Sequence, residues 1–299
     1  MGMSRRVCGA TLTTRGQDLL AQARPVHWLK NLIVFVPLLT SQQFFHWAMW
    51  PSVAVAFASF CLAASAGYQL NDVIDLKADR QHSQKRTRPL ASGQVSTREA
   101  VALGTSLAAA SLMLALAVSP QLALIVLGYM ALSALYSTVL KRVAGVDVLA
   151  LAALYCARIF GGAVAIGVIV SPYLLAFSGF LFLSLALMKR FITFTASEIR
   201  LPGFYGHSYG ALMLGSGVAT AFLSCGLLGL YVADPEIRAR YSSPDLLWGV
   251  WLVLSYAMLR GWLRAGRGLL DEDLARAAAR DRPLWALGVL AVAVFLTAY

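Results

Sequence analysis

Residues 51–80 read PSVAVAFASFCLAASAGYQLNDVIDLKADR. The first twenty of these residues carry no charge, and about 20 apolar residues in a helix are enough to cross a bilayer core roughly 30 Å thick. The last ten include three aspartates, Asp72, Asp75 and Asp79. The stretch therefore predicts a membrane-spanning helix over 51–71 with a strongly acidic end.

The rest of the chain repeats this pattern of apolar runs separated by charged or turn residues. Its 299 residues are 59% hydrophobic and 13% charged, which is more apolar surface than one soluble core can hide. The remaining apolar runs predict spans at 31–49, 98–118, 120–140, 146–168, 171–188, 208–232, 244–263 and 282–298. The first is interrupted by Pro37 and by the polar run 40–43. Since irregular backbone cannot face lipid, the predicted fold class is an all-α integral membrane bundle of about nine transmembrane helices.

The distribution of basic residues predicts the orientation of this bundle. Nearly all of the 25 Lys and Arg residues fall in the N-terminal arm or in alternate loops, whereas only Arg238 and Arg240 fall on the opposite side. The positive-inside rule then places the N-terminus in the cytoplasm. Residues 1–30 form a cytoplasmic arm, in which 14–24 are expected to be an interfacial helix, and 31–299 form the transmembrane domain. The net charge of +11 follows from this topology, so no nucleic-acid partner is predicted.

Cysteine and histidine positions argue against a zinc site or a disulfide framework. Neither residue type occurs at ligand spacing. The residues are Cys8, Cys61, Cys156 and Cys225, and His27, His46, His82 and His207.

The acidic end of the 51–71 helix carries the strongest chemical signal. At 100° per residue, Asp72, Asp75 and Asp79 fall within about 60° of one another on a continuous helix. Together with Asn71 they supply the hard oxygen ligands that Mg²⁺ prefers, with water and substrate phosphates in the remaining positions. The alternative is a set of solvated acids at a helix end.

A basic segment follows this acidic cluster. Lys85, Arg86 and Arg88 are placed to neutralise a diphosphate leaving group held beside the carboxylates. The alternative for each of them is an ordinary positive-inside loop. Ser96 and Glu99 have capping-box spacing, which predicts that the next helix begins there.

A second set of candidates lies in and around the predicted span 146–168. Arg158 is in an apolar run, and a costly intramembrane arginine indicates a functional site or a buried ion pair, for example with Asp147. The substrate-binding candidates are Asn71, Lys30, Tyr136, Lys141, Asp147, Tyr155, Arg158, Lys189 and Arg190. Lys189 and Arg190 are expected to open the loop that follows the sixth helix.

The pattern N-D-x-x-D-x-x-x-D over Asn71–Asp79 resembles the first aspartate-rich motif of the UbiA superfamily of intramembrane prenyltransferases. Further motifs are similar to the branch that contains decaprenyl-phosphate phosphoribosyltransferase. These are Arg24-Pro25-x-x-Trp28-x-Lys30-Asn31, Lys85-Arg86-x-Arg88-Pro89, Tyr136-Ser137-x-x-x-Lys141 with Asp147, Arg158-x-x-x-Gly162, and Arg280-Asp281-Arg282. Aromatic prenyltransferases of the superfamily usually carry a second aspartate-rich motif, whereas residues 189–207 contain no aspartate.

The resemblance implies a Mg²⁺-dependent, pyrophosphate-releasing transferase. Its expected reaction moves 5-phosphoribosyl from phosphoribosyl pyrophosphate to a polyprenyl phosphate, with Asp72, Asp75 and Asp79 as metal ligands. Prenyl transfer to an aromatic acceptor is the alternative reaction. A transporter is a third hypothesis, but the sequence has no internal repeat and its charges gather at one face. The expected location is the bacterial cytoplasmic membrane, with the site facing the cytoplasm. The sequence leaves open whether the protein forms a homo-oligomer.

Overall fold

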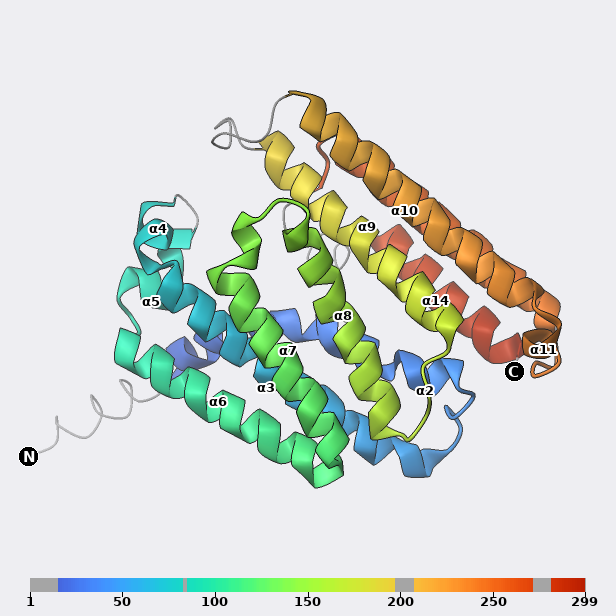
Figure 1. Ribbon diagram of the computed structural model, residues 1–299, viewed down its shortest axis with the longest axis horizontal. Coiled ribbons are helices and arrows are strands. Elements are labelled where there is room, and N and C mark those ends of the chain that lie inside the picture. Colours follow the sequence, from blue (N-terminus) through green and yellow to red (C-terminus); the bar gives the residue numbers. More distant parts are fainter. Residues whose placement is uncertain (1–15, 83–84, 197–206, 271–280, 299) are drawn as a thin grey trace, which may run out of the picture. The chain divides into compact units, whose positions relative to one another are not determined.

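The computed structural model describes residues 16–82, 85–196, 207–270 and 281–298, and these residues form helices without a strand (Figure 1). They belong to two compact units. The first unit comprises residues 1–147 and 157–169, and the second comprises 148–156 and 170–299. Helix α8 (Val146–Ala165) contributes residues to both units. The all-α fold class is therefore confirmed for the described part of the chain.

Three long helices form the body of the first unit: α3 (Trp50–Ile74), α6 (Thr97–Val118) and α7 (Pro120–Thr138). They lie side by side (Figure 1). Helices α3 and α6 are joined by two buried serines, because each of Ser59 and Ser111 donates its hydroxyl to the other's backbone carbonyl, at 2.9 and 2.8 Å. Such hydrogen bonds between helices tie a bundle together where apolar burial against lipid gives little specificity.

Short elements connect these helices. Helix α4 (Leu76–Gln81), the 3₁₀ turn η3 (Lys85–Thr87) and α5 (Pro89–Ser92) lie between α3 and α6, and η4 (Leu140–Arg142) follows α7. The predicted capping box begins α6, since the Ser96 hydroxyl accepts from the Glu99 backbone and the Glu99 carboxylate accepts from the Ser96 backbone. This prediction is confirmed.

Seven helices of the described chain are long and apolar enough to cross a membrane. They correspond to the predicted spans that begin at 51, 98, 120, 146, 171, 208 and 244. Helix α14 (Arg282–Ala298) is apolar but has only 17 residues. The structure thus supports an integral membrane protein, and the total of nine spans stays a prediction.

The predicted span 31–49 is not one continuous helix. A 3₁₀ helix, η1 (Pro25–Phe35), continues into the short α2 (Val36–Thr40), after which Gln42 adopts a positive φ of 60° and η2 (Trp47–Met49) leads to α3. The polar run 40–43 separates the two apolar stretches and contains the turn. Residues 16–23 are helical, in agreement with the helix expected at 14–24.

The first segment, which comprises η1 and α2 (residues 25–40), packs through η1 against the C-terminal half of α8 within the first unit. A Cβ atom at Gly162 would overlap the backbone oxygen of Val34, and one at Gly161 would overlap the Phe60 ring. No side chain fits at either position, so the two glycines allow η1 and α3 to approach α8. This close approach fixes the position of η1, and with it Lys30 and Asn31, relative to α8.

We expect Gly162→Ala to destabilise the protein by about 1–3 kcal/mol, because the added methyl overlaps backbone rather than a movable side chain. Thermal unfolding in detergent measures the effect. Gly128→Ala is the matched control, since Gly128 also lies in a helix of the first unit, and a methyl group added there would meet no atom within 4 Å. Equal or higher stability of both variants would contradict the packing described here.

The second unit contains α9 (Pro172–Ala196), α10 (His207–Ala233), α11 (Pro235–Arg238), η5 (Pro244–Leu246), α12 (Leu247–Gly266) and α14. Helices α9 and α10 run side by side (Figure 1). The core of this unit includes Met188, Phe191 and Trp262. Burial of Phe191 and Ile192 explains why α9 continues to Ala196, so the expectation that Lys189 and Arg190 open a loop is wrong.

Candidate active site

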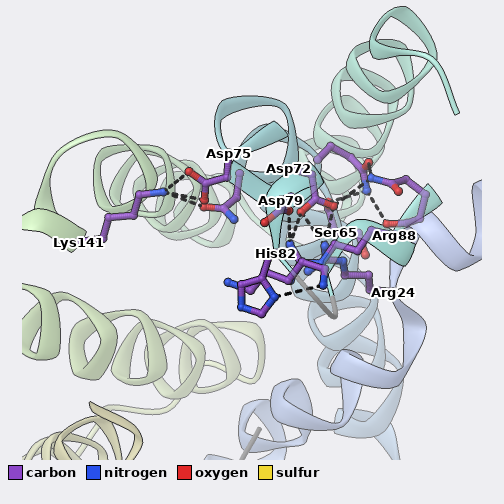
Figure 2. A network of polar contacts seen from close by, with 12 residues as sticks. Arg24, Ser65, Asp72, Asp75, Asp79, His82, Arg88 and Lys141 are labelled. Carbon is purple, nitrogen blue, oxygen red and sulfur yellow. Dashed lines mark hydrogen bonds and ion pairs between the residues drawn. The ribbon is translucent and has the colours of Figure 1, made fainter. Parts of the chain in front are cut away.

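The acidic end of α3 is not a continuous helix. Helix α3 ends at Ile74, Asp75 has φ −90° and ψ 6°, and α4 begins at Leu76. The three aspartates have two different sets of basic partners (Figure 2). Asp72 and Asp79 both contact Arg88, whereas Asp75 contacts Lys141. Backbone bonds of helical spacing, from Asp75 to the Asn71 carbonyl at 2.9 Å and from Asp79 to the Asp75 carbonyl at 2.8 Å, continue through this position, and the shared acidic face as a metal site stays a prediction.

Asp72 is the most enclosed of the three carboxylates, with a side-chain exposure of 2%. The Arg24 guanidinium lies 2.6 Å from both of its oxygens, and the Gln22 amide donates to Oδ2 at 3.0 Å. Arg88 donates to Oδ1 at 3.3 Å. A buried carboxylate is tolerated when it is paired and hydrogen-bonded in this way. Asp72 thus fixes the N-terminal segment on α3.

Arg88 connects the two buried aspartates. Its Nη1 lies 2.5 Å from Asp79 Oδ2 as well as 3.3 Å from Asp72 Oδ1, and its side chain is 27% exposed. The guanidinium therefore bridges α3 and α4 while it remains within reach of solvent. Of the three predicted basic residues, Arg88 is the one that the structure brings to the carboxylates.

Asp75 has a separate partner. Lys141, in η4, donates to its two oxygens at 2.7 and 2.8 Å and lies 3.5 Å from Asn71 Oδ1. The Asp75 side chain is 29% exposed. The predicted candidates Asn71 and Lys141 therefore lie beside the most accessible of the three carboxylates.

The other two basic residues of the predicted loop, Lys85 and Arg86, differ from Arg88 in their contacts. Both are in η3, where Arg86 is exposed and Lys85 is half-buried. The Lys85 backbone donates to His82 Nδ1 at 3.4 Å. In the part of the chain that the structure covers, neither side chain forms an ion pair with Asp72, Asp75 or Asp79.

Arg158 lies in the interior of the first unit. Its Nε donates to Asn31 Oδ1 at 2.7 Å, its Nη2 donates to the Tyr129 hydroxyl at 2.9 Å, and its guanidinium carbon is 4.8 Å from the centre of the Tyr129 ring. Asp147 is eleven residues earlier in α8, which is about 16 Å along a helix, so it is not the ion-pair partner. Arg158 therefore joins α8 to α7 and to the first segment.

We expect Arg158→Lys to lower the free energy of unfolding by about 1–3 kcal/mol, because one ammonium group does not reproduce the two directed bonds of the planar guanidinium. Thermal unfolding of Arg158→Lys, Tyr129→Phe and the double variant forms a double-mutant cycle. A coupling of about 0.5 kcal/mol or more is expected for groups in contact. Strict additivity of the two changes would contradict the Arg158–Tyr129 bond.

The remaining predicted residues are distributed over both units. In the first, Lys30 is half-buried in η1, Tyr136 is half-buried in α7, and Asp147 is buried in the first turn of α8. In the second, Tyr155 stacks on Phe182 with ring centres 5.0 Å apart. Lys189 and Arg190 lie on α9 in that same unit.

Four residues that support Asp72 are not among the predicted site residues, although Arg24 is part of the Arg24–Asn31 motif. Ser65 and Gln69 of α3 hold the N-terminal segment by bonds of 2.7 Å to the Ala23 carbonyl and 2.8 Å to the Gln22 carbonyl. Arg24 adopts a left-handed backbone conformation, with φ 55°, that non-glycine residues rarely adopt. Ser65, Gln69 and Asp72 are spaced by four and three residues, so a polar stripe in an otherwise apolar helix was the available signal. The four are Gln22, Arg24, Ser65 and Gln69.

The donor chemistry of this cluster fits a hard divalent cation, although the residues do not form a ready-made cage. Within the described chain, no group of three or more acidic, histidine or cysteine side chains is close enough to hold a metal ion. The buried amide oxygen of Gln22 accepts no hydrogen bond from the described residues, while its amide nitrogen donates to Asp72. A buried oxygen without a partner costs about 1–3 kcal/mol, which a ligand beside Asp72 could recover. We therefore treat metal binding at this cluster as a proposal.

The fold and the site together define an integral membrane helical protein with a paired acidic and basic cluster at a helix end. The chain belongs to the UbiA prenyltransferase family, whose family model matches residues 32–193.

Two relatives and one solved structure illustrate this membership. The protein y4nM of Sinorhizobium fredii is 35% identical over 290 residues, which cover 94% of this chain and 56% of y4nM. Decaprenyl-phosphate phosphoribosyltransferase of Mycolicibacterium smegmatis is 34% identical over 184 residues, 60% of this chain and 58% of that enzyme. The chain thus spans under two thirds of the length of both relatives. A UbiA homolog from Archaeoglobus fulgidus bound to GPP and Mg²⁺ shares the fold, with TM-score 0.66, 19% identity, and coverage of 94% of this chain and 99% of that one.

Proposed function

We propose that this protein transfers 5-phosphoribosyl from phosphoribosyl pyrophosphate to a membrane polyprenyl phosphate and releases pyrophosphate in a Mg²⁺-dependent reaction. The observation that carries the proposal is the cluster in which three aspartates are each paired with a basic side chain. Such a cluster offers carboxylates for a cation and cations for a phosphate at the same place. The similarity to decaprenyl-phosphate phosphoribosyltransferase supports the choice of donor and acceptor.

Asp72, Asp75 and Asp79 are the residues that would hold Mg²⁺. The bound ion would supply charge neutralisation on the departing diphosphate. Asp75 is accessible and is the residue best placed to accept a cation first, since Asp72 already accepts hydrogen bonds from Gln22, Arg24 and Arg88.

In this proposal the basic partners of the aspartates also bind substrate phosphate. A carboxylate that held the cation would leave its arginine or lysine partner able to bind a phosphate oxygen in the same region. Arg24, Arg88 and Lys141 are the residues with this exchange available, and arginine suits it because its planar fork pairs with either carboxylate or phosphate. Lys85 and Arg86, on η3, would add charge near the leaving group.

In the transfer step, the bond between C1 of the ribose and the diphosphate oxygen breaks, and the diphosphate leaves with the electron pair. C1 forms its new bond to an oxygen of the acceptor phosphate. Because this oxygen is already anionic, the reaction needs no residue to remove a proton from it. The task of the protein is to position the two substrates and to stabilise the developing negative charge.

We assign the other predicted residues to substrate positioning. Lys30 is adjacent to Asn31, which accepts a hydrogen bond from Arg158, so Arg158 would position Lys30 through η1. The further positioning candidates in the first unit are Asn71, Tyr136 and Asp147. Tyr155, Lys189 and Arg190 lie in the second unit, and their part in substrate binding stays a prediction from the sequence. The positive-inside distribution supports a site on the cytoplasmic face of a bacterial cytoplasmic membrane.

Prenyl transfer from a polyprenyl diphosphate to an aromatic acceptor is the second candidate function. The observation that favours it is the shared fold with the A. fulgidus UbiA homolog bound to GPP and Mg²⁺. Both reactions would use the same carboxylates and the same departing diphosphate. The acceptor and the transferred group distinguish them.

The test is pyrophosphate release by the purified protein in lipid nanodiscs with Mg²⁺, phosphoribosyl pyrophosphate and polyprenyl phosphate. We expect turnover that depends on all three, with formation of the phosphoribosylated lipid. Asp75→Asn should lower turnover by about 10²–10³-fold, a size typical for loss of one electrostatic group in an active site. Asp245→Asn is the matched control, because this exposed aspartate of the second unit pairs only with Arg238 among the described residues.

Three results would contradict the proposal. One is release of pyrophosphate from geranyl diphosphate with an aromatic acceptor but not from phosphoribosyl pyrophosphate, which would establish the second function. Another is full turnover after Asp75→Asn. The third is an equal loss in Asp75→Asn and Asp245→Asn with both proteins folded.

A further inference from the structure

The second unit contains an apolar groove that the proposed function does not use. It has a volume of about 390 Å³ and lies between α10 and α12. Phe222 lines it from α10, and Trp262, Leu263, Gly266 and Arg267 line it from α12 and the end of that helix. Arg267 is the single charged residue in this lining.

The floor of the groove is held rigidly. Trp262 is buried, and its indole nitrogen donates to the Ser184 hydroxyl at 3.0 Å, which itself donates to the Gly217 carbonyl at 2.8 Å. A Cβ atom at Gly217 would overlap the Trp262 ring, so glycine is needed for the ring to lie this close to α10. The groove is therefore built into the packing of the two helices.

The walls of the groove are apolar and exposed. Phe222 is 52% exposed and Leu263 is 53% exposed. Only 28% of the apolar window of α10 and 11% of that of α12 are buried inside the protein. In a membrane protein such surfaces meet hydrocarbon chains. The chemistry of the walls thus favours an acyl chain as the occupant.

The charged residues at one end of the groove indicate which lipid headgroup would bind there. Arg260, Arg264 and Arg267 follow one another toward the C-terminus of α12, and the first two are ion-paired with Asp281. Arg267 is exposed and forms no ion pair among the residues that the structure describes. Among the residues that the structure describes, two arginines share one carboxylate and a third, Arg267, stands at the end of the groove. The acidic run 271–273 that follows in the sequence lies outside the described residues. The exposed Arg267 guanidinium is complementary to a lipid phosphate.

We propose that the α10–α12 groove binds an anionic phospholipid of the bilayer, with one acyl chain against Trp262 and the phosphate at Arg267. The groove and the carboxylate cluster of the first unit have no residue in common. A guanidinium–phosphate hydrogen bond explains a preference for anionic lipid at the end of α12, whereas an apolar groove without a charged residue would show none.

Native mass spectrometry of the purified protein tests this proposal, with phosphatidylglycerol and phosphatidylcholine of identical acyl chains as probes. We expect phosphatidylglycerol to be retained about tenfold more tightly, a difference of about 1.4 kcal/mol, and Arg267→Gln to abolish this preference because the charge-assisted hydrogen bond is lost. Arg98→Gln is the matched control, because Arg98 is an exposed arginine at the start of α6. It should leave the preference unchanged.

A second variant tests the apolar part of the site. Gly266 lines the groove, and a Cβ atom there would have no neighbour within 4 Å, so Gly266→Leu fits without strain. We expect it to reduce retention of both lipids while the melting temperature is maintained. Equal retention of the two lipids by the unmodified protein, or equal losses in Arg267→Gln and Arg98→Gln, would overturn the proposal. Displacement of phosphatidylglycerol by equimolar polyprenyl phosphate would also overturn it, by assigning the groove to a substrate.

Discussion

The burial of Asp72 is the constraint on which the first unit depends. A carboxylate with 2% exposure at the end of an apolar helix is stable only when other groups satisfy its charge and its oxygens. Gln22 and Arg24 do so from the N-terminal segment, and Arg88 does so from the segment between α4 and α5. The same carboxylate thereby draws together three parts of the chain that are distant in sequence. The candidate active-site cluster is thus also the structural junction of the unit.

The three aspartates fall into two groups according to their basic partners. Asp72 faces the N-terminal segment, whereas Asp75 pairs with Lys141 beyond α7. The observed geometry separates the charges and provides each with a basic partner. It also leaves Asp75 more accessible than Asp72, which gives the two residues different parts in the proposed chemistry.

The sequence predicted those features that depend on local pattern. The apolar runs located α3, α6 and α7 to within a few residues, and the spacing of Ser96 and Glu99 located the start of α6. Helical periodicity predicted an acidic helix end, but it could not predict that Asp75 pairs with Lys141, because 66 residues separate the two. The Arg24–Asp72 pair could not be predicted from spacing, since 48 residues separate its members. The approach of Gly162 to Val34 depends on the fold of the whole unit, so it was equally inaccessible.

The pairing of Asp72, Asp75 and Asp79 with Arg24, Arg88 and Lys141 has a thermodynamic consequence. Three negative and three positive side chains make a cluster with no net charge of its own. A lone divalent cation would leave surplus positive charge in a partly buried region, and a lone diphosphate would leave surplus negative charge. The two together nearly cancel. By linkage, each ligand then raises the affinity for the other by the same factor, so the metal–diphosphate complex, rather than either ion, is the species that a cluster of this composition selects.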